Sequence, residues 1–510
     1  MSDTVVLDAP LTRDEIVTVA KGAHLLLSPA AKDRIRNARG IVDAILRDGI
    51  RGYGINTGVG ALCDVIVGPE DQSRLSHNIL FSHACGIGEV LPPLETRAIM
   101  AAQINNFAHG RSGVRLEVVE TLVALLNAGL LPVVPAGGSV GYITHAAAIG
   151  LVVIGAGEVS DGSARIPATE ALGRIGRAPL KLAAKEGLSL VNGTPCVTGF
   201  ACLALARAEH LLDWADAAAA WAQGILGRQP NVFPPEGVAM HKSAGLATTA
   251  AHIRGAVEGT RYSDGISRTQ DPMSLRAVPQ IHGAVRDSLR HVAAVIATEL
   301  QSATDNPLLG GSASQPQVFS QAHAVSSGMG LAMDQLAILV AQIAATSERR
   351  MDRMVNPLVS GLPAFLSAES GVGSGFMIAQ YTAVALVAEN RRLSAPASLD
   401  GGITSGLQED VLPHSTPAAL KALRIVDNLQ MVLAIELMAA AQASDLAQEV
   451  SLSQGLADLH RQIRDIVAFY RDDRPLNQDM HAICAYIGTS RAQGGGPTPE
   501  SQTYQDAPGR

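Results

Sequence analysis

Tyr53 is the first residue of this chain whose type and surroundings suggest chemistry, because it lies in a glycine-rich turn with Gly52, Gly54, Gly58 and Gly60. A phenol accepts a proton only when it is ionised or nearly so, and the unperturbed pKa of tyrosine is ~10. Glycines allow a tight loop that brings backbone N–H donors close to such a group. A tyrosine that only packs in the turn is the alternative interpretation.

Three further polar residues suggest recognition of a small molecule. The guanidinium of Arg276 has the fork geometry that suits a carboxylate, although an arginine at the end of a loop is more often part of a surface ion pair. A histidine and a carboxylate that share a site can hydrogen-bond both nitrogens of an imidazole ring, and His83 and Glu409 are residues of these two types. His83 as an ordinary interior histidine is the alternative.

Seven short motifs between residues 50 and 410 resemble, in order, those of the histidine/phenylalanine ammonia-lyase family. The motifs are YGINTGVG (53–60), SHACGIGE (82–89), EGLSLVNGT (186–194), QDPMSLR (270–276), TDNPL (304–308), GFMIAQYTA (375–383) and QED (408–410). Weaker similarity continues to DRPL at 473–476. One motif alone would be weak evidence, but seven in family order identify the chain as a member.

The prosthetic-group segment of that family is incomplete here. In the family, GSVG is followed by an Ala-Ser-Gly triad that cyclises into an electrophilic methylidene-imidazolone. Here GSVG (138–141) runs directly into Tyr142, and the flanks align only across a gap of three residues. Cyclisation of Gly138, Ser139 and Val140 instead is disfavoured, because the β-branched Val140 replaces the unobstructed glycine that ring closure uses. We therefore predict catalysis without a metal or an organic cofactor.

The resemblance also implies roles for individual residues. Tyr53 would be the base and Arg276 would hold the substrate carboxylate, while His83 and Glu409 would face the ring of an imidazole substrate. The remaining residues expected at the substrate are Asn192, Gln270, Asn306, Tyr142, Met273 and Tyr381.

Three departures concern the half of the site that handles the amine. Met273 stands where the family usually has a tyrosine, Val411 replaces a common histidine, and Tyr142 stands where an aspartate normally follows the triad. A primary ammonium must be captured through its lone pair before it leaves, whereas a quaternary trimethylammonium has no lone pair and departs as neutral trimethylamine. The substrate predicted is thus an imidazole amino-acid betaine, as in the family branch that splits ergothioneine into trimethylamine and thiourocanate.

Other functions stay open at this point. Hercynine, the sulfur-free betaine, or another betaine could be the substrate, and a catalytically inactive paralogue could bind an imidazole ligand. Tyr142 would line the trimethylammonium pocket, where an aromatic face contributes ~0.5–2 kcal/mol, or would merely fill the space of the missing triad.

Composition predicts a mostly α fold, because the chain is rich in Ala and Leu and has only 3% aromatic residues. Apolar runs at 199–222, 329–347 and 425–441 predict helices buried in a bundle. The family resemblance implies an ammonia-lyase/fumarase-like long central helical bundle, assembled as a homotetramer. We expect an N-terminal domain over 1–190, the bundle over 191–489 and a mobile tail over 490–510.

Charge and cysteine usage limit the cellular setting. The net charge of -8, without basic runs, argues against nucleic acid as a partner. No secretory signal or membrane-spanning stretch is expected, and five cysteines without metal spacing indicate a reducing cytoplasm. The expected partners are a small-molecule substrate and further copies of the chain.

Overall fold

The computed structural model describes residues 4–399 and 401–492, which form two compact units. Unit 1 takes the described residues within Met1–Ala206, His291–Ala337 and Ser394–Arg424, and unit 2 those within Arg207–Arg290, Ile338–Leu393 and Ile425–Arg510. Of the expected tail, residues 493–510 lie outside the described part of the chain.

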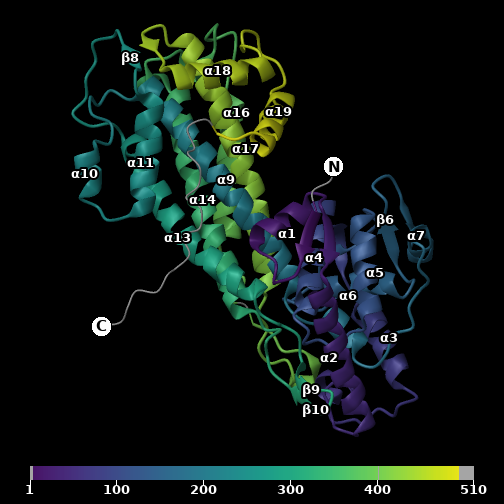
Figure 1. The fold of residues 1–510 in the computed structure, drawn as a ribbon. Coiled ribbons are helices and arrows are strands. Elements are labelled where there is room, and N and C mark those ends of the chain that lie inside the picture. The colour runs from purple at the N-terminus through teal and green to yellow at the C-terminus, as the bar shows by residue number, and fades with distance from the viewer. Residues whose placement is uncertain (1–3, 400, 493–510) are drawn as a thin grey trace. The chain divides into compact units, whose positions relative to one another are not determined.

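Unit 1 contains short helices and small sheets (Figure 1). Its elements are β1 (Thr4–Leu7), α1 (Arg13–Ala20), β2 (His24–Leu27), α2 (Pro29–Arg47), η1 (Gly60–Leu62), α3 (Gln72–His83), β3 (Ile87–Val90), α4 (Pro93–Ala108), α5 (Leu116–Asn127), β4 (Leu131–Pro132), β5 (Pro135–Gly137), α6 (Thr144–Val153), β6 (Glu158–Ser160), β7 (Arg165–Pro167), α7 (Ala168–Arg174), α8 (Glu186–Val191), β9 (Leu308–Ser312), β10 (Gln315–Phe319) and η3 (Ser405–Leu407).

The core of unit 1 includes α4, whose residues from Thr96 to Ala108 are all buried. A helix enclosed on every face needs no polar stripe, which explains its lack of amphipathic pattern. The preceding α2 starts at a Ser28 cap, whose hydroxyl accepts the Ala31 N–H, with Pro29 at the first helical position. Among the small sheets, β1 and β2 pair in parallel, whereas β3 pairs antiparallel with β5 and so fixes the strand just before Gly138.

Four long helices begin in one unit and end in the other: α9 (Pro195–Leu226), α13 (Val278–Leu300), α14 (Ser327–Val355) and α17 (Ser415–Leu446). The elements wholly within unit 2 are α10 (Pro235–Ala239), α11 (Ala244–Val257), β8 (Arg261–Tyr262), α12 (Met273–Arg276), α15 (Pro357–Ser360), η2 (Ala364–Leu366), α16 (Met377–Leu393), β11 (Val450–Ser451), α18 (Gln454–Ile466) and α19 (Asn477–Thr489).

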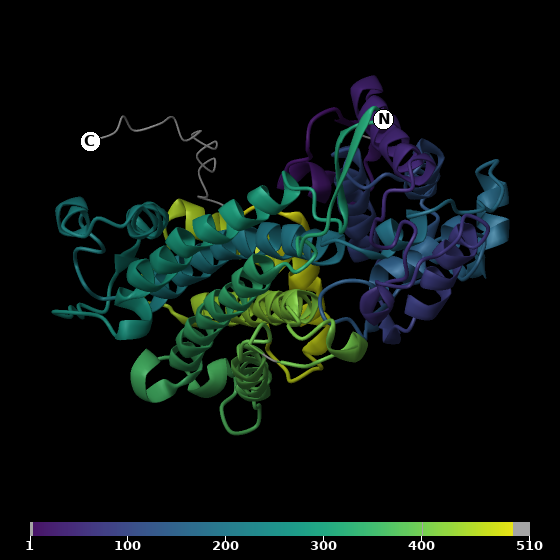
Figure 2. The ribbon, with the colours of Figure 1, turned by 90° about the horizontal axis from the view of Figure 1, so that it is seen from below.

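Buried polar contacts tie the long helices together inside unit 2, where Figures 1 and 2 show them side by side. Asp216 of α9 accepts hydrogen bonds from His282 of α13 at 2.7 Å and from His252 of α11 at 2.9 Å. Arg350 of α14 donates to the carboxylate of Glu436 of α17 at 2.6 Å, with both side chains fully buried. Breaking such pairs leaves an uncompensated buried charge, so they fix which helix faces meet.

The mostly α architecture predicted from composition is confirmed. The three apolar runs lie inside α9, α14 and α17, and their Ala and Leu side chains are largely buried. Two stretches, Glu186–Leu226 and Ser327–Val355, are long and apolar enough to cross a membrane by length and composition alone. The apolar window of the first is buried throughout, which is the behaviour of a core helix.

Candidate active site

The hydroxyl of Tyr53 is fixed by the turn that carries it. The backbone N–H of Gly60 donates to the Tyr53 hydroxyl oxygen at 2.8 Å, and Gly54 and Gly60 both adopt positive φ, at 60° and 57°. The turn is braced from within, because Asn56 accepts from the Gly52 N–H at 2.9 Å and Thr57 from the Gly54 N–H at 3.1 Å. The glycines thus bring one backbone donor onto the phenol oxygen, as expected.

The pKa of Tyr53 nevertheless lies above its ordinary value. Burial raises it most, the hydrogen bond from Gly60 lowers it, and the nearby carboxylate of Glu409 raises it further. In the protein alone these surroundings therefore disfavour the phenolate. A positive charge brought in by a ligand would act in the opposite direction.

Tyr142 and Glu409 join Tyr53 in one cluster within unit 1. The Tyr142 hydroxyl donates a short hydrogen bond to the Glu409 carboxylate, although 267 residues separate them. Tyr142 is only 6% exposed, and burial followed by the Glu409 hydrogen bond raises the pKa of its phenol strongly. The charge of Tyr53 also acts on Tyr142, so all three side chains share one electrostatic environment. Among the described residues, no hydrogen bond to the second oxygen of Glu409 is seen.

The loop before Tyr142 is held in place by hydrogen bonds. The His414 N–H donates to the Val140 carbonyl at 2.7 Å, and the Thr416 hydroxyl to the Gly141 carbonyl at 2.8 Å. The Ser139 hydroxyl donates to the Tyr142 carbonyl at 3.1 Å. These hydrogen bonds tie the loop to the start of α17 and to its own following residues.

Backbone strain is concentrated around the same loop. Ile143, which caps α6, has φ 80°, a conformation that β-branched residues rarely adopt. Gly141 has φ 141°, and a Cβ there would lie 2.6 Å from the ring of Pro413. On the Glu409 side, Ser405 and Leu407 also have positive φ, at 53° and 73°. Such strain persists only where the surroundings over-determine it, and it occurs often at functional sites.

The turn that carries Glu409 packs directly against the turn that carries the donor to Tyr53. A Cβ on Gly60 would lie 2.1 Å from the Ser405 hydroxyl, and Ala61 lies 3.2 Å from the position of a Cβ on Gly406. Glycine at 60 is thus required by close approach as well as by its φ. This contact aligns η1 with η3 and explains how Tyr53 and Glu409 meet.

Asn192 and Asn306 also meet in unit 1, but mainly through structural hydrogen bonds. Asn192 Nδ2 donates to the Asn306 carbonyl at 2.7 Å, and its Oδ1 accepts from the Gly193 N–H at 2.9 Å. The Asn306 side-chain oxygen accepts from the Gln321 N–H at 2.9 Å. Their side-chain oxygens are therefore occupied, which leaves chiefly the Asn306 Nδ2 group for a ligand.

A buried ion pair between Lys185 and Asp305 supports the segments that carry these two asparagines. Lys185 Nζ lies 3.0 Å from Asp305 Oδ2 and 2.8 Å from Ser189 Oγ, with Lys185 and Asp305 almost fully buried. Lys185 precedes α8, which ends next to Asn192, and Asp305 precedes Asn306. The pair thus links the two segments, although burial lowers the pKa of the lysine.

His83 ends α3 in unit 1 and is half-buried. Its Nδ1 shares a hydrogen bond of 2.9 Å with the Ser82 hydroxyl, and burial lowers the pKa of the imidazole, so the neutral form dominates near pH 7. Within residues 4–399 and 401–492, no hydrogen bond joins His83 to Tyr53, Tyr142 or Glu409. Its Nε2 is left for another partner.

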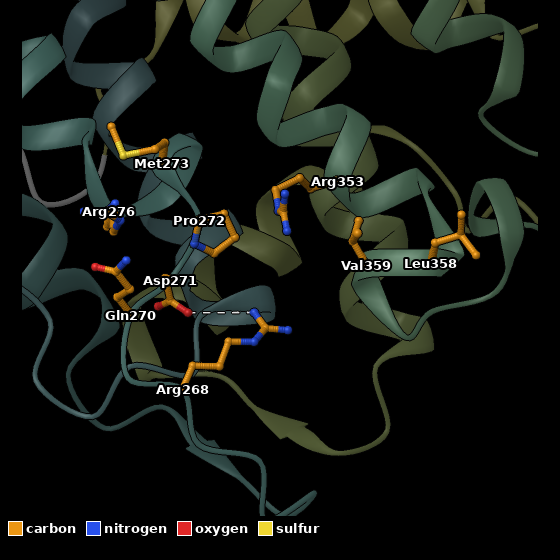
Figure 3. Close-up of a pocket in the computed structure, with 9 residues that line it drawn as sticks. All are labelled: Arg268, Gln270, Asp271, Pro272, Met273, Arg276, Arg353, Leu358 and Val359. Carbon is orange, nitrogen blue, oxygen red and sulfur yellow. Dashed lines mark ion pairs between the residues drawn. The ribbon is translucent and has the colours of Figure 1, made fainter.

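Gln270, Met273 and Arg276 belong to unit 2, where they line a cavity of about 550 Å³ (Figure 3). The other lining residues are Arg268, Asp271, Pro272, Arg353, Leu358 and Val359. Figure 3 shows Met273 and Arg276 on one side of this space and Arg353 reaching in from α14. Met273 is 60% exposed, and Tyr381, on α16, is 62% exposed and does not line the cavity.

The loop that carries Gln270 and leads into α12, where Arg276 lies, is anchored through Asp271. Its carboxylate accepts from Gln223 Nε2 at 2.9 Å and from the Arg228 N–H at 3.0 Å, and Arg268 lies 3.8 Å away. Arg268 and Arg353 are not among the residues predicted from the sequence, because each is an arginine in a loop or helix with no motif around it. Among the described residues, no group of three His, Cys, Asp or Glu side chains is placed to hold a metal ion.

Comparison with known proteins decides the family. Residues 11–465 match the family described as "Aromatic amino acid lyase". The histidine ammonia-lyase of Anaeromyxobacter dehalogenans (strain 2CP-C) is 42% identical, over 95% of this chain and 98% of that protein. This chain belongs to the aromatic amino acid lyase family.

Solved structures of other family members share the fold. The histidine ammonia-lyase from Trypanosoma cruzi is similar at a TM-score of 0.88 and 33% identity, covering 95% of this chain and 93% of that one. The ergothioneine-degrading enzyme ergothionase from Treponema denticola is similar at a TM-score of 0.88 and 26% identity, covering 95% and 99%. The family places this chain among carbon–nitrogen lyases that act on small molecules.

Proposed function

We propose that this protein is a carbon–nitrogen lyase that eliminates trimethylamine from ergothioneine to give thiourocanate, without a methylidene-imidazolone. The observation that carries the proposal is the missing triad between Gly141 and Tyr142, with the Tyr142 phenol held on Glu409 beside Tyr53. The fold similarity to an ergothionase supports it.

The chemistry of the leaving group makes an electrophile unnecessary. Tyr53 takes the proton from Cβ, the electrons of that bond form the Cα–Cβ double bond, and the Cα–N pair leaves with neutral trimethylamine. A quaternary nitrogen has no lone pair with which to attack an electrophile, and it has no proton to lose. The rebuilt amine side of the site, with Tyr142 and Met273, fits this reaction.

The raised pKa of Tyr53 fits a substrate that carries a permanent positive charge. In the protein alone, burial and Glu409 disfavour the phenolate. The trimethylammonium nitrogen is attached to the carbon next to the reacting Cβ, so a bound betaine would place its cation close to the phenol and favour ionisation. The face of Tyr142 would contribute ~0.5–2 kcal/mol to holding that cation.

The ring and the carboxylate would be held by the other predicted residues. His83 Nε2 and the second oxygen of Glu409 would bond the heterocycle, and Asn306 would donate to the substrate. Arg276 and Gln270 would bind its carboxylate end from unit 2 of a neighbouring copy, with Met273 near the amine, in the cytoplasmic homotetramer that the family resemblance implies. The exposed apolar Ile378 and Tyr381 of α16 support such self-association.

Hercynine is the second candidate substrate. The 42% identity to a histidine ammonia-lyase, together with His83 and Glu409, favours an imidazole ring without sulfur. The same leaving-group argument applies to hercynine, because its nitrogen is also quaternary.

The test is ultraviolet absorbance of the purified protein mixed separately with ergothioneine, hercynine and histidine, with trimethylamine and ammonia measured in each sample. We expect a rising thiourocanate band and trimethylamine from ergothioneine. Trimethylamine from hercynine alone would move the assignment to the second candidate. No product from any of the three would overturn both and leave an imidazole-binding paralogue without lyase activity.

A further inference from the structure

The cavity of unit 2 is more basic than binding by Arg276 alone requires. Arg268, Arg276 and Arg353 all line it, and Asp271 is the one carboxylate among the described lining residues. Figure 3 shows Arg353 entering from the side of α14, opposite Met273 and Arg276 of α12. The three cations therefore come from three places in the chain: the loop before α12, α12 itself and α14.

Asp271 is already occupied by its own loop. Its two oxygens accept from Gln223 Nε2 and from the backbone N–H groups of Arg228 and Gln229, and Arg268 is its ion-pair partner. Arg268 also donates to the Leu226 carbonyl at 3.2 Å. These contacts satisfy the acid without drawing on the other two guanidinium groups.

Arg276 and Arg353 are thus the two cations of this cavity without an ion pair among the described residues. Asp352, which precedes Arg353 on α14, accepts a hydrogen bond from Gln380 at 2.7 Å instead. Two guanidinium forks on one cavity can share the oxygens of a single carboxylate, and they leave a positive balance that favours a ligand with net negative charge.

We propose that Arg353 is a second carboxylate-binding residue of this cavity, which acts with Arg276 and makes the site bind the acrylate product more tightly than the betaine substrate. The inference rests on the proposed function in taking the ligand to be an imidazolyl carboxylate. The betaine has no net charge, whereas the acrylate left after trimethylamine departs is an anion. Two guanidinium groups near the quaternary nitrogen therefore favour cleavage and retain the product.

The test is calorimetric binding of urocanate, an imidazolyl acrylate, to the full-length protein and to Arg353→Gln, at low and high salt. We expect the variant to bind urocanate about tenfold more weakly, the usual effect of losing one hydrogen-bonded charge. Arg353→Lys should recover part of the salt-sensitive affinity. Urocanate methyl ester, with the same ring and double bond but no charge, should bind the wild-type protein and Arg353→Gln equally.

Two controls separate a local effect from a general one. Arg392→Gln removes an exposed arginine in the last turn of α16 and should leave urocanate affinity unchanged. Thermal unfolding of Arg353→Gln should match the wild type. Equal urocanate affinity in Arg353→Gln and wild type, or no urocanate binding to the wild type, would overturn the inference. Arg353-dependent urocanate binding by a protein that cleaves no betaine would refute the proposed function and keep this inference.

Discussion

The Tyr53→Phe variant is the most informative single change, because it removes one oxygen atom from the proposed base. In the folded protein that atom accepts one hydrogen bond, from the Gly60 N–H at 2.8 Å. Loss of this bond in a half-buried turn costs about 0.5–1.5 kcal/mol, which is small against a total stability of about 5–15 kcal/mol. The variant should therefore fold, with η1 still packed on η3.

The effect on turnover should be far larger than the effect on stability. A positioned general base contributes about 10²–10⁴ in rate, equivalent to about 3–5 kcal/mol of activation free energy. Ergothioneine should still bind within about threefold of wild type, because the aromatic ring remains. Thiourocanate absorbance would give kcat, and calorimetry would give Kd for the inactive variant.

A matched control is available in Tyr486, whose hydroxyl donates one hydrogen bond of 2.7 Å to Gln462. Tyr486→Phe loses a comparable bond from a half-buried tyrosine and should keep full turnover. If Tyr53→Phe retains more than about a tenth of the wild-type kcat, the assignment of the base is refuted, since that loss lies well below the general-base range.

Three further outcomes follow from the described contacts. The value of kcat/KM should rise with pH as Tyr53 ionises. Glu409→Gln should move this rise to lower pH, because the lost charge no longer raises the pKa of the phenol. A pH profile that does not move would contradict the electrostatic contact between Glu409 and Tyr53. Gly141→Ala should cost about 1–3 kcal/mol by urea unfolding and reduce turnover, because its Cβ would strike a proline ring, whereas Gly162→Ala, also at positive φ but in open space, should keep turnover. Burial alone would raise the pKa of Asp216, but hydrogen bonds from two histidines hold it well below its usual range. Asp216→Asn should then lower the free energy of unfolding by about 3–5 kcal/mol at pH 7, and this difference from the wild type should shrink as pH falls below about 4. The same difference in free energy of unfolding at pH 7 and pH 3 would contradict this.

Local features of this protein could be predicted from its sequence. The runs at 199–222, 329–347 and 425–441 are helical because Ala and Leu are good helix formers, and they are buried because they are apolar on most faces. The turn around Tyr53 could also be predicted, since its glycines permit the close approach that places the Gly60 N–H on the phenol.

Contacts between distant segments could not be predicted in the same way. No local pattern shows that Tyr142 meets Glu409 across 267 residues, or that Ser405 closes on Gly60. The pKa of Tyr53 depends on burial and on a carboxylate brought by another segment, so its direction could not be predicted from the turn alone. The motif that contains Asn192 predicts a place at the substrate, but it gives no sign of the hydrogen bond from the Asn192 side chain to the Asn306 carbonyl.

The central claim is that a quaternary leaving group replaces the electrophile. It is tested most directly by turnover of ergothioneine against 2-thiohistidine, which has the same ring and carboxylate but a primary ammonium group. The account predicts thiourocanate and trimethylamine from ergothioneine, and no thiourocanate from 2-thiohistidine. Release of ammonia from 2-thiohistidine at a comparable rate would contradict it, because that reaction needs the electrophile that this sequence is proposed to lack.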